Sequence, residues 1–141
     1  MVNRRMDVLV IDDDDLMCEV VERSLRRIGA GYRVVSAIDG QDGLDILRGR
    51  SETKVSQPYL VLLDLNMPRM DGFEFLEEVR KDPKLWQSVI FVLTTSNADG
   101  DRTRAYDEQI AGYMVKSAVG PQLAHLATML RDYASVVELP I

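Results

Sequence analysis

The chain has 141 residues, of which 46% are hydrophobic and 28% charged, and its formal net charge is −6. These values are typical of one soluble globular domain, and they argue against nucleic-acid binding, which requires a basic face to displace counterions from phosphates. The single cysteine, Cys18, excludes an internal disulfide and fits a reducing compartment.

Five segments rich in apolar and β-branched residues are predicted to form β-strands. In chain order they are residues 8–11, 32–37, 60–63, 89–93 and 112–115. The first, third and fourth do not alternate apolar with polar residues. We therefore expect both faces of these strands to be buried, as in a parallel sheet that lies between layers of helices.

Helical periodicity marks the segments between the strands. The predicted helices cover residues 16–28, 41–48, 73–81, 98–109 and 123–134. The first shows an apolar stripe at helical spacing, made of Leu16, Val20, Val21, Leu25 and Ile28. The segment 98–109 has only a weak apolar face, because charged residues fill most of it.

A strand followed by a helix, repeated five times, predicts a flavodoxin-like (βα)5 fold in the α/β class. Its five-stranded parallel sheet is doubly wound, has the order 2-1-3-4-5 and binds ligands at the carboxyl ends of the strands. We expect one domain over residues 1–141, with a core at about 6–134 and a short apolar tail at 135–141. No apolar run approaches the roughly 20 residues of a membrane span, and residues 1–6 lack the apolar middle of a secretory signal. A cytoplasmic protein without membrane contact is therefore predicted.

Acidic residues follow the first and third predicted strands. The first strand stops at the run from Asp12 to Asp15, and the third stops at Asp64. If these strands are neighbours, Asp12, Asp13 and Asp64 meet at one rim, where each carboxylate pair at 4 Å would repel by about 4 kcal/mol. A hard cation relieves that repulsion, and oxygen ligands on a compact rim suit Mg²⁺. Such a run is also typical of a helix N-terminus, and we assign capping to Asp14 and Asp15.

Two further strand ends add groups that bind phosphate. The fourth predicted strand ends at Thr94 and Thr95, and the fifth ends at Lys116. An ammonium group and a hydroxyl beside a carboxylate cluster can both bind phosphoryl oxygens. Together with the three acids they are the parts of a phosphoryl-transfer site whose nucleophile is a carboxylate.

The sequence resembles the receiver domain of bacterial two-component response regulators over nearly its whole length. The motifs that carry the resemblance are Val10-Ile11-Asp12-Asp13, Leu63-Asp64-Leu65-Asn66-Met67-Pro68-Arg69-Met70-Asp71-Gly72, Leu93-Thr94-Thr95 and Gly112-Tyr113-Met114-Val115-Lys116. The second of these is the most specific. The resemblance implies a phospho-accepting signalling switch, which catalyses nothing beyond its own phosphorylation and dephosphorylation.

The same resemblance implies a role for each matched residue. Asp64 would accept the phosphoryl group from a phosphohistidine of a sensor kinase. The cofactor Mg²⁺ would be held by Asp13, Asp64 and the backbone carbonyl of Asn66, with Asp12 acting through a bound water.

The resemblance also implies that three further residues respond to the phosphorylation of Asp64. Lys116 would pair with the phosphoryl oxygens, and Thr94 would turn toward the phosphate. Tyr113 would move inward with Thr94 and alter the neighbouring surface. Such a charge change biases an element that has two conformations.

Details of the sequence are similar to the single-domain regulators associated with bacterial phytochrome histidine kinases. They include Lys116-Ser117-Ala118, the polar loop at 49–58 and the end of the chain at 138–141. Ser117 stands where receivers commonly have proline in a cis bond, and a cis bond before a non-proline residue costs about 2.5–4 kcal/mol, which leaves the geometry open. Partners would be a sensor kinase, a downstream or phosphotransfer protein, and in a homodimer a second copy. The tail 136–141 is either a dimer-exchange arm or a segment that folds back or frays.

Other functions remain in competition with the switch. A Mg²⁺-dependent aspartate phosphohydrolase would carry Asp at the position of Asn66, and a nucleotide-binding module would carry a glycine-rich loop after the first strand. An adaptor that has lost phosphorylation would lack one of the key residues. His125 is the only histidine and cannot make a zinc site alone, and Trp86 is predicted to anchor packing.

Overall fold

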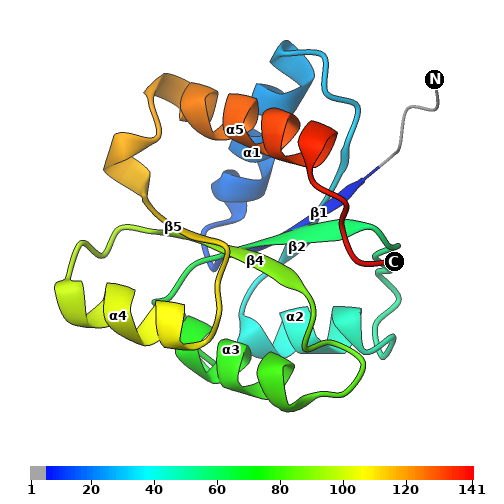
Figure 1. Ribbon diagram of the computed structural model, residues 1–141, viewed down its shortest axis with the longest axis vertical. Helices are drawn as coiled ribbons and strands as arrows, with labels where there is room; N and C mark the ends of the chain where they lie inside the picture. Colours follow the sequence, from blue (N-terminus) through cyan, green and yellow to red (C-terminus); the bar gives the residue numbers. More distant parts are fainter. Residues whose placement is uncertain (1–5) are drawn as a thin grey trace.

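The computed structural model describes residues 6–141 and shows a parallel sheet between two layers of helices (Figure 1). The strands are β1 (Asp7–Ile11), β2 (Arg33–Ala37), β3 (Tyr59–Leu63), β4 (Val89–Thr94) and β5 (Gly112–Val115). Their order is β2-β1-β3-β4-β5, and all four pairs are parallel. The predicted fold class and strand order are therefore confirmed. The prediction about a secretory signal falls largely on residues 1–5, which lie outside the described residues.

Five α-helices connect and cover these strands. They are α1 (Asp15–Arg27), α2 (Gly40–Leu47), α3 (Gly72–Lys81), α4 (Asp99–Asp107) and α5 (Ala124–Val136). Figure 1 shows α1 and α5 on one face of the sheet and α2, α3 and α4 on the other. None of the helices within residues 6–141 is long and apolar enough to cross a membrane.

The core forms two layers because the sheet is covered on both faces. Every residue of β1 is buried, as its unbroken apolar pattern predicts. Leu9 and Ile11 face a cluster that includes Phe75 from α3, whereas Val8 and Val10 face a cluster that includes Leu25 from α1. The alternating side chains of one strand therefore contribute to both hydrophobic layers.

Helix α1 follows its predicted stripe except at the first position. Val21 and Leu25 are buried, but Leu16, the first residue of the stripe, is 63% exposed. Leu16 lies in the first turn of α1, next to the exposed residues Asp14 and Asp15. Asp14 accepts a hydrogen bond from the Leu16 N–H at 3.0 Å, which confirms the predicted cap.

Helix α4 is held mainly by surface contacts, in agreement with its weak apolar pattern. Its only buried residue is Ala105. The Arg104 guanidinium lies 4.1 Å from the centre of the Phe73 ring, and it also lies 3.6 Å from a carboxylate oxygen of Glu77. Both partners belong to α3, so polar and cation–π contacts replace the usual hydrophobic seam.

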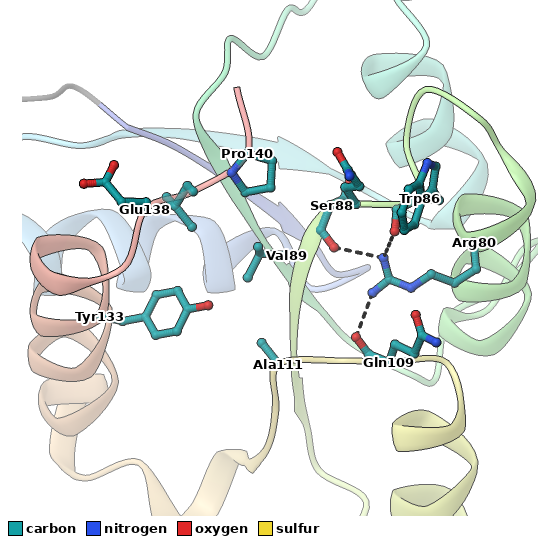
Figure 2. Close-up of a pocket in the computed structure, with 11 residues that line it drawn as sticks. Arg80, Trp86, Ser88, Val89, Gln109, Ala111, Tyr133, Glu138 and Pro140 are labelled. Carbon is teal, nitrogen blue, oxygen red and sulfur yellow. Dashed lines mark hydrogen bonds between the residues drawn. The ribbon is translucent and has the colours of Figure 1, made fainter.

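The end of the chain packs on the rest of the same molecule. Helix α5 extends to Val136, two residues beyond the predicted end of the core, and Leu139 is buried in the cluster on the α1 and α5 side. Leu139 and Pro140 line a cavity of about 520 Å³, with Tyr133 beside them and Trp86 across it (Figure 2). Trp86 is 49% exposed, so it lines this wall and is not the predicted packing anchor. The exchange of the tail between two copies stays a prediction.

Arg80 joins two loops at the same end of the sheet, and Figure 2 shows its guanidinium between their carbonyls. It donates to Trp86 O at 2.7 Å, to Ser88 O at 2.9 Å, to Glu108 O at 2.7 Å and to Gln109 O at 3.1 Å. Burial lowers the pKa of this arginine, against the opposing charge of Glu108. One side chain therefore satisfies four backbone acceptors from the α3–β4 and α4–β5 loops.

Replacing this arginine is expected to destabilise the whole fold. Arg80→Met should lower the free energy of unfolding by about 2–4 kcal/mol, because four carbonyls lose a charged donor. Urea denaturation measures the loss. The control Arg131→Met removes an exposed pair with the adjacent Asp132 and should change stability by less than about 0.5 kcal/mol. Equal losses in the two variants would contradict this role of Arg80.

Candidate functional site

The carboxyl ends of β1 and β3 bring three acids to one rim. Ile11 and Leu63 are paired in register, so Asp12 and Asp64 follow at the same level. The Asp64 N–H donates to Ile11 O at 3.0 Å, which fixes the two strand ends against each other. One carboxylate oxygen from each of Asp12, Asp13 and Asp64 lies within 4.8 Å of the others. The strand order thus produces the acidic cluster that the sequence predicts.

Lys116, which directly follows β5, reaches this cluster from across the sheet. Its Nζ donates to Asp12 Oδ2 at 2.8 Å and lies 3.6 Å from Asp64 Oδ2. Burial by itself would lower the pKa of Lys116, but the hydrogen bond to Asp12 and the charges of Asp64 and Asp12 outweigh it and raise that pKa. The lysine is therefore fully protonated at neutral pH.

Asp12 is the least solvated member of the cluster, with 4% of its surface exposed. Burial raises the pKa of Asp12, and the charge of Asp64 adds to that effect. Hydrogen bonds from Lys116 and from the Asp14 N–H oppose it. Three carboxylates and one ammonium leave a formal charge of −2 (−3 and +1) on the rim when all are ionised. Such a site attracts a divalent cation.

Asp64 is held in one orientation by its neighbours. Its Oδ1 accepts from the Leu65 N–H at 2.8 Å, which leaves Oδ2 directed toward Lys116. Gly72 at the start of α3 lies against this turn: a Cβ there would collide with the Asp64 carbonyl oxygen and lie 2.8 Å from Leu65 Cα. Only glycine fits, which explains why this residue ends the motif.

Thr94 and Tyr113 meet through Ser96 in the β4–α4 loop. Thr94 is fully buried, and its Oγ1 accepts from the Ser96 N–H at 3.4 Å. The Tyr113 side chain packs against the core, and its hydroxyl donates to Ser96 O at 3.0 Å. Sequence reasoning missed this link, because nothing in the spacing shows which carbonyl the tyrosine reaches.

The residues present fit a hard divalent cation such as Mg²⁺. The donors are carboxylate oxygens of two buried acids, Asp12 and Asp64, and of the exposed Asp13. Asn66, whose carbonyl the resemblance adds to this set, is exposed and lies two residues after Asp64. Mg²⁺ prefers such oxygen ligands and keeps several waters, which the open side of the rim can admit.

The bond after Lys116 is trans. Within residues 6–141 the only cis peptide bond joins Gln57 and Pro58. Residues Lys116–Ala118 form a short 3-10 turn instead. The trans geometry agrees with the high energy of a cis bond before a residue other than proline, here Ser117.

One buried acid near the rim was not predicted from the sequence. Asp39 lies two residues after the end of β2 and is only 2% exposed. It caps α2 by accepting from the Asp42 N–H at 2.8 Å, and it also accepts from Arg69 Nε at 2.6 Å. Its position two residues beyond the end of a strand, like that of Asp13 beyond β1, is the signal that could have found it.

The family model of the response regulator receiver domain matches residues 8–128, so the chain belongs to this family. The probable methanogenesis regulatory protein FilR2 of Methanothrix harundinacea is 31% identical over 126 residues, covering 89% of this chain and 81% of that protein. Response regulator Rcp1 of Synechocystis sp. is 31% identical over 111 residues, covering 78% of this chain and 76% of that protein. The chain spans 51% and 48% of the length of two further relatives, both named as transcriptional regulators.

Solved structures with similar folds include regulators of phytochrome signalling. The phosphorylated cyanobacterial phytochrome response regulator RcpA has a TM-score of 0.86 and 30% identity, covering 98% of this chain and 100% of that chain. The Mn²⁺-bound form of Rcp1 has a TM-score of 0.82 and 26% identity, covering 96% of this chain and 99% of that chain. This chain is therefore the receiver domain of a two-component response regulator, with phytochrome-associated proteins among its structural neighbours.

Proposed function

We propose that Asp64 accepts a phosphoryl group from a phosphohistidine of a sensor kinase in a Mg²⁺-dependent reaction. The observation that carries the proposal is the convergence of five groups on one rim. The carboxylates of Asp12, Asp13 and Asp64 lie together, Lys116 Nζ is 2.8 and 3.6 Å from two of them, and Thr94 ends the adjacent strand. Few other functions need this combination at the carboxyl end of a parallel sheet.

The transfer uses Asp64 Oδ2 as the nucleophile. The oxygen forms a bond to phosphorus while the bond from phosphorus to the histidine nitrogen breaks, and the electron pair of that bond stays on the imidazole. Asp13, Asp64 and the carbonyl of Asn66 would hold Mg²⁺, with Asp12 contributing through a water. The cation would supply positive charge that offsets the negative charge of the phosphoryl oxygens. Lys116 already lies beside Oδ2 and pairs with a phosphoryl oxygen after transfer.

Thr94 then transmits the change from the phosphorylated site to the rest of the domain. Its hydroxyl turns to donate to a phosphoryl oxygen, which changes its contact with the Ser96 N–H. The Tyr113 hydroxyl bonds the carbonyl of the same Ser96, so the two side chains respond together. The affected surface belongs to α4 and β5, and we propose that output occurs there by contact with a downstream or phosphotransfer protein.

The partner kinase is proposed to be of the phytochrome type. The likeness to RcpA, a phytochrome response regulator by its name, supports this pairing. Action in the cytoplasm and a homodimer belong to the same proposal. The phosphohydrolase is less favoured, because Asn66 stands where those enzymes carry a second aspartate.

A labelling experiment tests the proposal. The full chain is incubated with acetyl phosphate, with Mg²⁺ or with EDTA, and its intact mass is followed. We expect one base-labile phosphoryl group with Mg²⁺ and none with EDTA. Rapid turnover of many phosphoesters would support the hydrolase instead, and a chain that takes no label from any donor would be an adaptor.

A further inference from the structure

We propose that Asp39 and Arg69 are positioning residues for the metal site. Their ion pair holds the loop 65–71, and with it the carbonyl of Asn66, in place beside Asp64. The inference rests on the proposed function, since it concerns the same cation. It assigns a task to two side chains that lie outside the acidic cluster.

Asp39 is a fixed support because it is buried and fully engaged. Both carboxylate oxygens have a partner: Oδ1 accepts from the Asp42 N–H at 2.8 Å and Oδ2 from Arg69 Nε at 2.6 Å. Burial would raise the pKa of Asp39, but the hydrogen bonds from Arg69 and the Asp42 N–H outweigh it and lower that pKa. The carboxylate is therefore charged, and it is anchored at the first turn of α2.

Arg69 adopts a backbone conformation that needs support. Its φ is 64°, in the left-handed region that is unfavourable for a residue with a Cβ. Such conformations persist where the surroundings over-determine them, often beside functional sites. The ion pair with Asp39 is one such constraint, and it acts on a side chain that is otherwise 63% exposed.

Backbone contacts fix the rest of the loop. The Gly40 N–H donates to Met70 O at 3.0 Å, and a Cβ at Gly40 would lie 2.7 Å from Met70 Cγ. The Gly72 N–H donates to Leu65 O at 3.0 Å and closes the loop at its base. The closed loop therefore contacts the start of α2 through Met70 and Arg69. Asn66 lies within the same loop, three residues before Arg69.

The requirements of the cation explain why this support matters for binding more than for stability. Mg²⁺ demands nearly ideal octahedral geometry, so a small displacement of one carbonyl weakens binding. An ion pair with one exposed partner contributes little to folding. Residues that orient metal ligands from outside the site typically change metal affinity about 10–100-fold when mutated.

The sign of the effect separates positioning from simple electrostatics. Arg69→Ala removes a positive charge, which by long-range electrostatics alone would tighten the binding of Mg²⁺. If the ion pair positions the loop, the same substitution weakens binding. The two explanations therefore predict opposite results for one variant.

The test is calorimetric titration of the full chain with Mg²⁺. We expect Arg69→Ala to bind about tenfold more weakly than the wild type, and Asp39→Asn to lose a similar factor. The double variant should lose no more than either single one, because both remove the same pair. The control Arg102→Ala removes an exposed pair with Asp99 at the start of α4, and its affinity should be unchanged or slightly higher.

A second variant separates the positioning of the loop from its folding. Arg69→Gly relieves the left-handed strain, so it should unfold at a higher temperature than Arg69→Ala and still bind Mg²⁺ weakly. Wild-type affinity in Arg69→Ala, or additive losses in the double variant, would overturn the inference and leave the proposed function standing. A wild-type chain that binds no Mg²⁺ would overturn both.

Discussion

Asp64→Asn is expected to abolish phosphorylation while the fold remains intact. An amide oxygen is a poor nucleophile and cannot form a stable acyl phosphate. The substitution keeps the shape of the side chain, and the amide oxygen can still accept from the Leu65 N–H. Removing one of three clustered charges also relieves repulsion, so the thermal unfolding temperature without Mg²⁺ should stay the same or rise. Intact mass after incubation with acetyl phosphate and Mg²⁺ gives the result.

A neighbouring acid of the same motif supplies the control for this loss. Asp71 caps α3 through the Glu74 N–H at 2.9 Å and takes no part in the cluster. Asp71→Asn should therefore still accept one phosphoryl group, with a loss of stability of at most about 1 kcal/mol. A label that survives in Asp64→Asn would show that another side chain, such as Asp13, is the acceptor.

Lys116→Met is expected to have the second large effect, on stability and phosphorylation together. The lysine side chain is 18% exposed and neutralises the carboxylates of Asp12 and Asp64, which are both buried. Removing one partner of a buried pair typically destabilises by about 3–5 kcal/mol, because the remaining charge has no counterion. Partial exposure places this site at the lower end, about 3 kcal/mol. Phosphorylation should become slow at saturating Mg²⁺, since a phosphoryl oxygen loses its cationic partner.

The stability difference between the wild type and Lys116→Met should decrease at high pH. The folded-state pKa of Lys116 is raised above its ordinary value of 10.5. The stability that the pair contributes is therefore fully present below about 10.5 and is lost as the pH rises through the higher folded-state pKa. Urea denaturation in EDTA should show a constant gap between wild type and Lys116→Met from neutral pH to about 10, which narrows above pH 10.5.

An ion pair at the opposite end of the sheet serves as the matched control. Arg33 lies 3.1 Å from the buried Asp7, but its own side chain is 55% exposed. Arg33→Met should be destabilised by less than Lys116→Met, and it should be phosphorylated at the wild-type rate. A slow reaction in Arg33→Met would mean that lost stability, and not the lost ammonium group, limits transfer in both variants.

The acidic cluster was predictable because it depends on strand order alone. An unbroken apolar run predicts a strand covered on both faces, and the order 2-1-3-4-5 makes β1 and β3 neighbours. Residues at the carboxyl ends then meet, whatever the details of packing. Asp12, Asp64 and Lys116 could therefore be placed from the sequence, as could the cap at Asp14.

Contacts between loops could not be predicted in the same way. The pair of Asp39 and Arg69 joins two turns that are 30 residues apart. It also depends on a left-handed φ at position 69, which an arginine, unlike a glycine, does not indicate. The contacts of Arg80 depend on two loops that end side by side. Leu16 is exposed although it lies on the apolar stripe, because periodicity gives the face of a helix but not how far along the helix that face is buried. What the sequence left open shares one cause, because the neighbours of a side chain in a loop or at a helix end depend on tertiary packing.

The sparse packing of α4 sets how large a signal the domain needs. Elements with few buried contacts open locally at low free energy, and α4 buries only Ala105. Inverting a two-state ratio from 1:99 to 99:1 requires about 5.5 kcal/mol of differential interaction. In the proposed switch, one phosphoryl group on Asp64, between Lys116 and Thr94, would have to supply this energy, and a weakly held element lowers the amount that is needed. Because α4 buries so little apolar surface, phosphorylation of one residue could change the position of this helix enough for a partner protein to detect it.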